Sequence, residues 1–201
     1  GQYPPRWHSI INSPVGRLYV AASDNALTGI WYEEQAHFPL PHELGERITD
    51  PAGLVAEADE VAQAIGADAE RRGEHIYVAP ARILAQTERE LDEYFRGRRT
   101  DFEVPLDPDG TDFQLAVWDY LKTVPYGYTV TYGEISRMVG PGAPAQAVGQ
   151  AVGHNKIAII IPCHRVLGAG GKLTGYAGGL DRKRWLLDRE EPKDIRSGRL
   201  F

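Results

Sequence analysis

The chain has 201 residues, 42% of them hydrophobic and 25% charged, which is ordinary for a globular protein and long enough for one large domain or two small ones. No apolar run approaches the roughly 20 residues of a membrane span, and no signal peptide is recognisable. The single cysteine, Cys163, excludes an internal disulfide and a cysteine-rich structural zinc site. We therefore expect a protein of the reducing cytoplasm, without a membrane partner.

The net charge of −6 is unevenly distributed along the chain. Residues 1–111 carry 10 Lys and Arg against 20 Asp and Glu, whereas residues 112–201 carry 12 against 8. A basic half on an acidic protein is the pattern expected when one face meets a polyanion. A C-terminal helix that is simply rich in arginine would explain the same count.

Three short runs near the start have the alternation of strands and are separated by turn signals at Ser13-Pro14 and Asp24-Asn25. They predict an antiparallel meander of strands over residues 7–11, 16–22 and 27–32. Residues 33–53 are rich in Pro, His, Glu and Gly without periodicity, and we expect them to form a loop. The loop's histidines have no cysteine nearby, so no metal site is expected there.

Two helices are predicted in the rest of the N-terminal half. Residues 54–72 are rich in Ala and Glu, and apolar residues then recur at helical spacing over residues 84–95. Gly97 follows as the expected C-cap of the second helix. Two prolines and a glycine make residues 104–110 the best linker candidate. We therefore expect an N-terminal domain of residues 1–107 and a C-terminal domain of residues 108–201.

The C-terminal half contains three predicted helices before the cysteine. Thr111 is expected to cap a helix that stops before Pro125, and Thr131 to cap a short helix that ends at Gly140. A second short helix begins near Pro144. Two short helices joined by a tight Gly/Pro turn match a helix-turn-helix, whose second helix commonly enters a DNA groove, although most helical hairpins bind nothing.

The second short helix is nearly uncharged, so its contacts with DNA would come mainly from backbone, glycine and shape. Gly149 and Gly153 are expected to allow a close approach of backbone to this helix.

Cys163 follows the apolar run Ile159-Ile-Ile-Pro and directly precedes His164. Isoleucines are stiff and β-branched, and Pro162 disfavours helix at the residue before it, so the run is expected to be buried and extended. A rigid, buried backbone would thus hold a thiol beside a titratable group. A free cysteine is also often no more than a small buried hydrophobe, and the Cys-His pair alone does not exclude that reading.

Several short motifs occur together in the second half, in a fixed order and spacing. They are Phe113-Gln114, Val117-Trp118, Pro125-Tyr-Gly, Thr131-Tyr-Gly, Ala147-Val-Gly, Asn155, Pro162-Cys-His-Arg-Val, Gly175-Tyr-Ala-Gly-Gly-Leu, Lys183, Trp185-Leu-Leu and Glu190. Because these motifs occur together, the chain resembles the O6-alkylguanine-DNA alkyltransferases, which transfer an alkyl group from damaged guanine to a cysteine of their own. The resemblance is dense over residues 111–191 and loose before them.

The resemblance implies an α+β fold, with an N-terminal α/β domain built on an antiparallel, RNase H-like sheet and a mostly helical C-terminal domain with a helix-turn-helix. It implies alkylated DNA as the partner, no cofactor, no metal and action as a monomer in the cytoplasm or at the nucleoid. Because a thioether is not hydrolysed under mild conditions, each molecule would react once.

The family mechanism implies a role for four side chains. Cys163 would attack the carbon bonded to guanine O6, and His164 would take the thiol proton through a water. Glu190, after the last helix, would orient the imidazole, and Asn155 would brace the active-site turn. Outside the motif, Glu190 would be read as a surface carboxylate and Asn155 as a helix C-cap. Arg165 would make a structural salt bridge.

Other residues are expected to hold the extruded base. Tyr132 would hydrogen-bond N3, Tyr176 would pack over the ring, and the backbone N–H of Ala177 would lie near O6. The carbonyls of Cys163 and Val166 would accept hydrogen bonds from the exocyclic amine. Either tyrosine could instead be ordinary core. The residues expected to face DNA are Thr131, Gln146, Ala147 and Gly149.

Two positions depart from the family pattern. Gln146 stands where the family usually has an arginine that fills the gap left by the flipped base, so we expect weaker or slower engagement of duplex DNA, or a preference for single-stranded or distorted DNA. Lys156-Ile-Ala158 replaces prolines at the pocket rim.

Three alternative functions stay open, namely an alkyltransferase specialised for unusual adducts, a non-enzymatic lesion-binding protein of the alkyltransferase-like type, and a Cys-His hydrolase.

Overall fold

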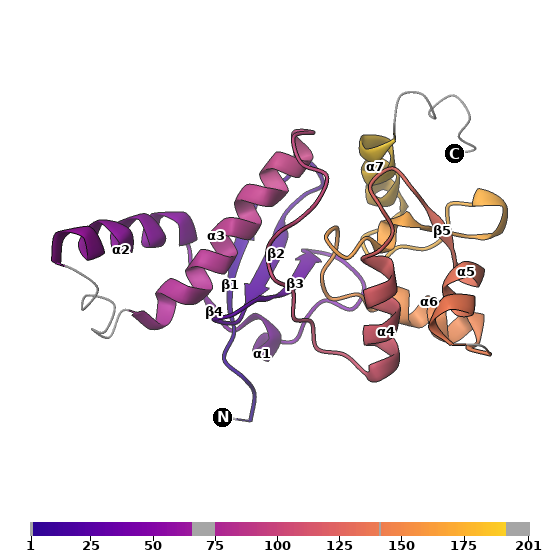
Figure 1. The fold of residues 1–201 in the computed structure, drawn as a ribbon, viewed down its shortest axis with the longest axis horizontal. Helices are drawn as coiled ribbons and strands as arrows, with labels where there is room; N and C mark the ends of the chain where they lie inside the picture. The colour runs from indigo at the N-terminus through magenta and orange to yellow at the C-terminus, as the bar shows by residue number, and fades with distance from the viewer. Residues whose placement is uncertain (1, 66–74, 141, 192–201) are drawn as a thin grey trace. The chain divides into compact units, whose positions relative to one another are not determined.

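The computed structural model describes residues 2–65, 75–140 and 142–191, and its sheet and helices confirm the α+β class (Figure 1). The chain divides into two compact units, one of residues Gly1–Glu33 and Pro39–Pro108, the other of Glu34–Phe38 and Asp109–Phe201. The short segment Glu34–Phe38 is therefore contributed to the second unit from within the first. Among the described residues, no helix has the length and apolarity needed to cross a membrane.

The first unit is built on the predicted antiparallel meander. Strand β1 (Trp7–Ile11) pairs with β2 (Leu18–Ala22), and β2 pairs with β3 (Leu27–Tyr32). The loop expected over residues 33–53 is wrong in part, because it contains the short helix α1 (Pro41–Leu44) and the strand β4 (Glu46–Arg47), which runs parallel to β1. The order of the sheet is thus β3-β2-β1-β4. A two-residue strand is too short to show periodicity in the sequence.

Two helices accompany the sheet. Helix α2 (Pro51–Ile65) begins three residues before the predicted start, and its predicted continuation over residues 66–72 lies outside the described residues. Helix α3 (His75–Phe95) packs against β1, β2 and β3, and α2 packs against α3 (Figure 1).

The apolar stripe of α3 explains this packing. Leu84, Leu91 and Tyr94 lie about one helical turn or a multiple of it apart and are fully buried. The helix ends at Phe95, and the predicted cap glycine, Gly97, follows two residues later with a φ of 74°, in the left-handed region that favours glycine.

The expected linker is partly paired with the sheet. Glu90, fully buried on α3, accepts hydrogen bonds from the backbone N–H groups of Glu103 and Val104, at 2.8 and 3.2 Å. Leu27 of β3 donates to the carbonyl of Pro105, and the N–H of Asp107 donates back to Leu27, both at 2.8 Å. Residues 104–107 are therefore held to the first unit, and sequence composition did not indicate this.

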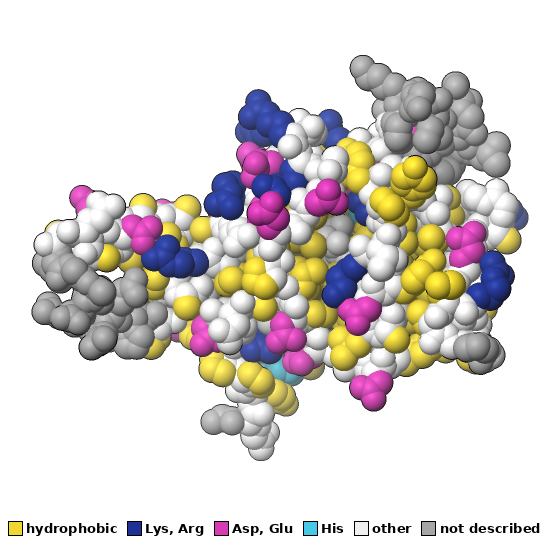
Figure 2. All heavy atoms as spheres, in the orientation of Figure 1, with side chains coloured by type: hydrophobic (Ala, Val, Ile, Leu, Met, Phe, Trp, Pro, Cys, Tyr) yellow, Lys and Arg dark blue, Asp and Glu magenta, His cyan; other side chains and the backbone are white. Residues whose placement is uncertain are grey.

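Charged side chains of both signs lie together at the C-terminal end of α3 (Figure 2). Arg96 contacts Asp92 at 3.0 Å and Arg99 contacts Glu93 at 3.3 Å. The arginines that follow the predicted helix thus include two that pair with acidic residues of α3. Such exposed pairs contribute little to stability.

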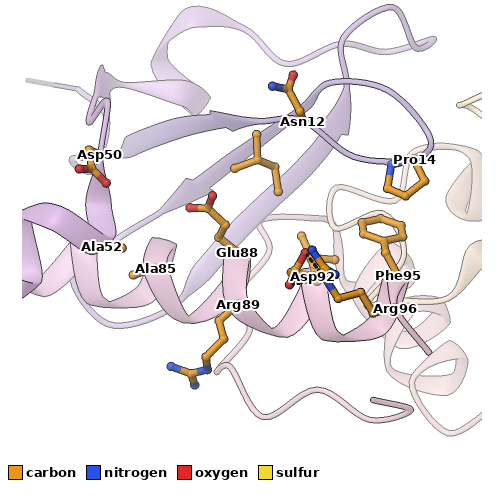
Figure 3. Close-up of a pocket in the computed structure, with 12 residues that line it drawn as sticks. Asn12, Pro14, Asp50, Ala52, Ala85, Glu88, Arg89, Asp92, Phe95 and Arg96 are labelled. Carbon is orange, nitrogen blue, oxygen red and sulfur yellow. Dashed lines mark hydrogen bonds and ion pairs between the residues drawn. The ribbon is translucent and has the colours of Figure 1, made fainter. Parts of the chain in front are cut away.

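A hollow of about 560 Å³ lies in this unit beside α3 (Figure 3). Asp50, Glu88 and Asp92 contribute carboxylates to it, and Figure 3 shows Glu88 pointing from α3 towards the strands. Partial burial raises the pKa of Glu88, and the charges of Asp50 and Asp92 add to that effect. None of the site residues expected from the sequence lines this hollow.

The first helix of the second unit is α4 (Asp112–Leu121), which Thr111 caps as predicted. The Thr111 hydroxyl accepts from the N–H of Gln114, and the Gln114 side chain accepts from the N–H of Thr111. Trp118 is buried on this helix, and its Nε1–H donates to the carbonyl of Ala151 at 2.8 Å.

The predicted pair of short helices is present. Helix α5 (Tyr132–Val139) follows the two-residue strand β5 (Val130–Thr131) and is capped by Thr131; helix α6 (Ala145–Gly153) follows Pro144. Ser136 donates to the carbonyl of Ala143 at 2.6 Å and so ties the turn to α5.

The remaining elements surround the cysteine. They are the short 3-10 helix η2 (Cys163–Arg165), the strand β6 (Val166–Leu167), which is parallel to β5, the 3-10 turn η3 (Ala169–Gly171) and the helix α7 (Leu180–Glu190). Glu190, expected after the last helix, is in fact the last residue of α7.

Candidate active site

The side chain of Asn155 organises the chain that leads to Cys163. Its Nδ2 donates to the carbonyls of Ile161, at 2.8 Å, and Ile157, at 3.3 Å, while its Oδ1 accepts from the N–H of Ile157 at 3.0 Å. Residues 158–160 consequently form turns, with Ile159 at a φ of 72°, and Ile161 lies in a bend. The expected extended conformation is therefore wrong, although most of this run is buried as predicted.

Cys163 lies at the start of η2 with 6% of its surface exposed. Asn155 Nδ2 donates to its Sγ at 3.1 Å. Burial raises the pKa of the thiol, and the Asn155 hydrogen bond and the positive charge of Lys183 oppose this without cancelling it. At neutral pH the sulfur is thus predominantly a thiol, and it needs a base before it can act as a nucleophile.

His164 is fully buried beside Cys163, and its Nε2 lies 2.6 Å from Glu190 Oε2. Burial alone would raise the pKa of Glu190, but the charge and hydrogen bonds of His164 and Arg165 outweigh it and lower the pKa to about 2. Because an ionised carboxylate only accepts, Nε2 must carry the proton. Nδ1 of His164 has no hydrogen-bond partner among the described residues, so it is the nitrogen at which the imidazole can exchange a proton.

Arg165 fixes the other oxygen of this carboxylate. Its Nε donates to Glu190 Oε1 at 2.7 Å, and its Nη1 donates to the carbonyl of Val124 at 2.6 Å. The expected structural salt bridge of Arg165 is thus made with Glu190 itself, at the end of α7.

Lys183 is a further buried group, for which the sequence suggested no role. Its Nζ donates to the carbonyls of Val166, Thr174 and Gly175, at 2.6, 2.8 and 3.3 Å. Burial lowers the pKa of Lys183 to about 8, against the opposing effect of Cys163. Lys183 therefore fastens β6 to the loop that precedes Tyr176, and it places a positive charge near the sulfur.

A pocket of about 280 Å³ opens onto Cys163. Its lining comes entirely from the second unit. The lining residues are Ala36, His37, Tyr132, Gly149, Val152, Gly153, Cys163, Gly175, Tyr176 and Ala177.

The pocket brings together five of the twelve site residues expected from the sequence, namely Cys163, Tyr132, Tyr176, Ala177 and Gly149. The remaining expected residues do not line it. Asn155, His164 and Glu190 are linked to the cysteine from within the protein, Val166 is buried with its carbonyl on Lys183, and Thr131, Gln146 and Ala147 lie on β5 and α6. A carbonyl has two lone pairs, so that of Val166 keeps the capacity for a second hydrogen bond.

The close backbone approach expected at the glycines of α6 is not found. A Cβ built at Gly153 would meet nothing within 4 Å, and one at Gly149 would meet only Tyr132 Cε1, at 4.0 Å. The two glycines line the pocket instead, and because they have no side chain they leave more space in it. Ala36 and His37 were missed because the sequence offers no signal that links them to a cysteine more than a hundred residues away.

Two protein-family models match this chain. The 6-O-methylguanine DNA methyltransferase, DNA binding domain, matches residues 112–192, and the ribonuclease-like domain of the same proteins matches residues 54–108. A methylated-DNA–protein-cysteine methyltransferase of Mycobacterium tuberculosis is 40% identical over 183 residues, which is 91% of each chain. The chain belongs to this family.

Other relatives give the same picture. A methylated-DNA–protein-cysteine methyltransferase of Methanosarcina acetivorans is 51% identical over 114 residues, 57% of this chain and 73% of that one. The crystal structure of the Mycobacterium tuberculosis O6-methylguanine methyltransferase matches with a TM-score of 0.69 at 38% identity, covering 96% of this chain and 99% of that one. The same organism's protein in complex with DNA matches with a TM-score of 0.70 at 39% identity, covering 94% and 96%. The family and its ribonuclease-like and DNA-binding domains confirm the expected resemblance and fold.

Proposed function

We infer that this protein repairs DNA by direct reversal, transferring an alkyl group from O6 of an alkylated guanine to Cys163. The observation that carries this function is the position of the cysteine, in the lining of a pocket and next to a buried His164–Glu190 pair, in a chain of the methyltransferase family. The partner is alkylated DNA, and we place the activity where the chromosome lies, in the cytoplasm or at the nucleoid.

The reaction exchanges one bond for another. The Cys163 thiolate forms a bond to the alkyl carbon while the bond between that carbon and O6 breaks, and its electron pair goes to the guanine. The proton that leaves the thiol is finally transferred to the guanine, so the products are a thioether on the protein and a normal guanine. Because nothing in this step regenerates the thiol, each molecule reacts once.

We propose that His164 is the base for the thiol. Glu190 holds the proton on Nε2, which leaves Nδ1 to accept, and its negative charge stabilises the imidazolium that forms. Among the described residues, Sγ and Nδ1 are not hydrogen-bonded to each other, so the proton needs a relay such as a water molecule. Asn155 supports the thiolate directly, because its Nδ2–H donates to the sulfur.

The pocket fits a planar base better than a flexible chain. Tyr132 and Tyr176 provide aromatic surfaces, and the glycines and alanines among its lining residues leave room beside them. Cys163 is buried, with 6% of the residue exposed, so an O6 atom stacked within a duplex would be out of reach of its sulfur. We propose that the target nucleotide is flipped out of the helix, with α6 in the groove and Gln146 entering the gap.

A titration with excess DNA tests this function against its alternatives. DNA containing O6-methylguanine is added in increasing excess, and the number of lesions cleared per protein molecule is counted. We expect a plateau at one lesion per molecule. Binding without any loss of the lesion would indicate a lesion-binding protein, and continued clearance beyond one lesion per molecule would indicate a turnover enzyme such as a hydrolase; either result contradicts the proposal.

A further inference from the structure

Two histidines are stacked at the pocket that opens onto Cys163. The ring centroids of His37 and His154 are 3.9 Å apart and their planes differ by 25°. His37 lines the pocket. His154 caps the C-terminal end of α6, and its Nδ1 lies 2.7 Å from the carbonyl of Gln150, to which it must therefore donate a proton.

The backbone of His37 is fixed in an unusual conformation. Its φ is 59°, in the left-handed region that residues with a side chain rarely adopt. The residue before it, Ala36, donates its N–H to the carbonyl of Ala177 at 3.1 Å, beside Tyr176. The segment Glu34–Phe38 is thus anchored to one wall of the pocket by a backbone hydrogen bond and to α6 by the stacked rings. Strained backbone that is held from two sides often occurs at functional sites.

The composition of the lining shows what His37 can do. Half of the ten lining residues are glycine or alanine and contribute little volume, while three carry rings, namely His37, Tyr132 and Tyr176. Under the proposed function the two tyrosines contact the extruded base. The third ring, that of His37, lines the same pocket and is the one that this assignment leaves without a contact to the base.

We propose that His37, held by His154, sets the upper size of the alkyl group that the pocket accepts. His37 is a specificity-determining residue, and His154 acts through it as a positioning residue. This proposal rests on the proposed alkyl transfer to Cys163. The segment Glu34–Phe38, which the N-terminal part of the chain supplies, thereby takes part in substrate selection.

The test compares the rates at which Cys163 acquires a methyl and a benzyl group from otherwise identical DNA. The variants are His37→Asn, which removes the imidazole but keeps a residue that tolerates left-handed backbone, and His37→Phe, which keeps a ring. We expect the benzyl-to-methyl rate ratio to rise at least about tenfold in His37→Asn, because small volume changes in a pocket discriminate by about this much. In His37→Phe the ratio should stay near the wild-type value.

His154→Ala removes the ring on which His37 stacks and leaves the lining residues of the pocket unchanged. It should raise the same ratio by less than His37→Asn, and the double variant should match His37→Asn alone, since His154 acts only through His37. His42→Ala is the matched control, because His42 is also stacked on a ring, that of Tyr3 at 3.8 Å, but belongs to the first unit and does not line the pocket. Its ratio should not change.

An unchanged ratio in both His37→Asn and His154→Ala, with a wild-type protein that does methylate Cys163, overturns this inference and leaves the proposed function intact. A wild-type protein that acquires no methyl group overturns the proposed function, and this inference with it. The two failures are therefore distinguishable in one experiment.

Discussion

Glu190 controls the imidazole of His164 in the proposed mechanism, through the 2.6 Å hydrogen bond between them. We predict that Glu190→Gln slows methyl transfer by about 10²-fold or more, because a neutral amide neither fixes the tautomer nor stabilises the imidazolium. The rate is measured as single-turnover loss of O6-methylguanine. Glu57→Gln, an exposed change on α2, is the matched control and should leave the rate unchanged. A Glu190→Gln protein that is folded and reacts at the wild-type rate would contradict this role.

The same carboxylate should make stability depend on pH. The pKa of Glu190 is about 2 in the folded protein, below the ordinary value of 4.5. The ionised carboxylate therefore stabilises the fold above pH 4.5, on the order of 3 kcal/mol, and this contribution is lost as the pH falls towards 2. We predict that the unfolding free energies of wild type and Glu190→Gln, from urea titrations, differ more at pH 6 than at pH 3. An equal difference at both values would exclude this coupling.

Lys183 should tune the reactivity of the sulfur. Its positive charge lowers the pKa of Cys163, although burial keeps that pKa above the ordinary value of a thiol. We predict that Lys183→Met raises the thiol pKa further and slows alkylation of Cys163 at neutral pH, by up to about tenfold for each pKa unit. The pH dependence of the reaction with iodoacetamide measures this directly. A profile that does not move towards higher pH would show that Lys183 only fastens the loop.

At this scale the sequence was most informative where a residue belongs to a short motif. Cys163, His164 and Glu190 could be named because the motif fixes their types and order, although His164 and Glu190 are 26 positions apart in the sequence, which hides their contact. The hydrogen bond from Asn155 to the sulfur and the stacking of His37 on His154 could not be named, because each depends on how distant turns fold.

Helix α6 presents an uncharged residue, Gln146, near the N-terminal end that we expect to meet DNA. We predict that Gln146→Arg strengthens binding to duplex DNA and makes the logarithmic salt dependence of affinity steeper by up to about 0.9, the value expected when one added positive charge neutralises one phosphate charge. Gln63→Arg, the same change at an exposed position of α2, is the matched control and should have little effect. No gain in affinity or in salt dependence for Gln146→Arg would place this residue outside the DNA interface.

Among elements, those with local signals were predictable. Thr111 and Thr131 cap α4 and α5, and Gly97 ends α3, because a cap needs only its own few neighbours in the sequence. Strand β4 and the turns at residues 158–160 were not predictable. The strand depends on pairing with β1 some forty residues away, and the turns depend on one asparagine side chain that overrides the β propensity of the isoleucines.

At the scale of the whole molecule, the predicted assignment of all site residues to the C-terminal half was incomplete. The C-terminal half was expected to hold every site residue, and no role followed from the acidic first half. The segment Glu34–Phe38 changes this, because it is supplied from the N-terminal part of the chain yet belongs to the second unit and lines the pocket with Ala36 and His37. Composition could not reveal it, since the segment lies in a stretch without periodicity.

The central claim for the molecule is that the sulfur of Cys163 receives the alkyl carbon that was bonded to O6 of guanine. The most direct measurement is peptide mass spectrometry after incubation with DNA that carries an isotopically labelled O6-methyl group. We predict one labelled methyl group per molecule, located on the peptide that contains Cys163, and none on a Cys163→Ser protein, which should leave the lesion in the DNA. Lesion loss with the Cys163→Ser protein, or a label found on another residue, would contradict it.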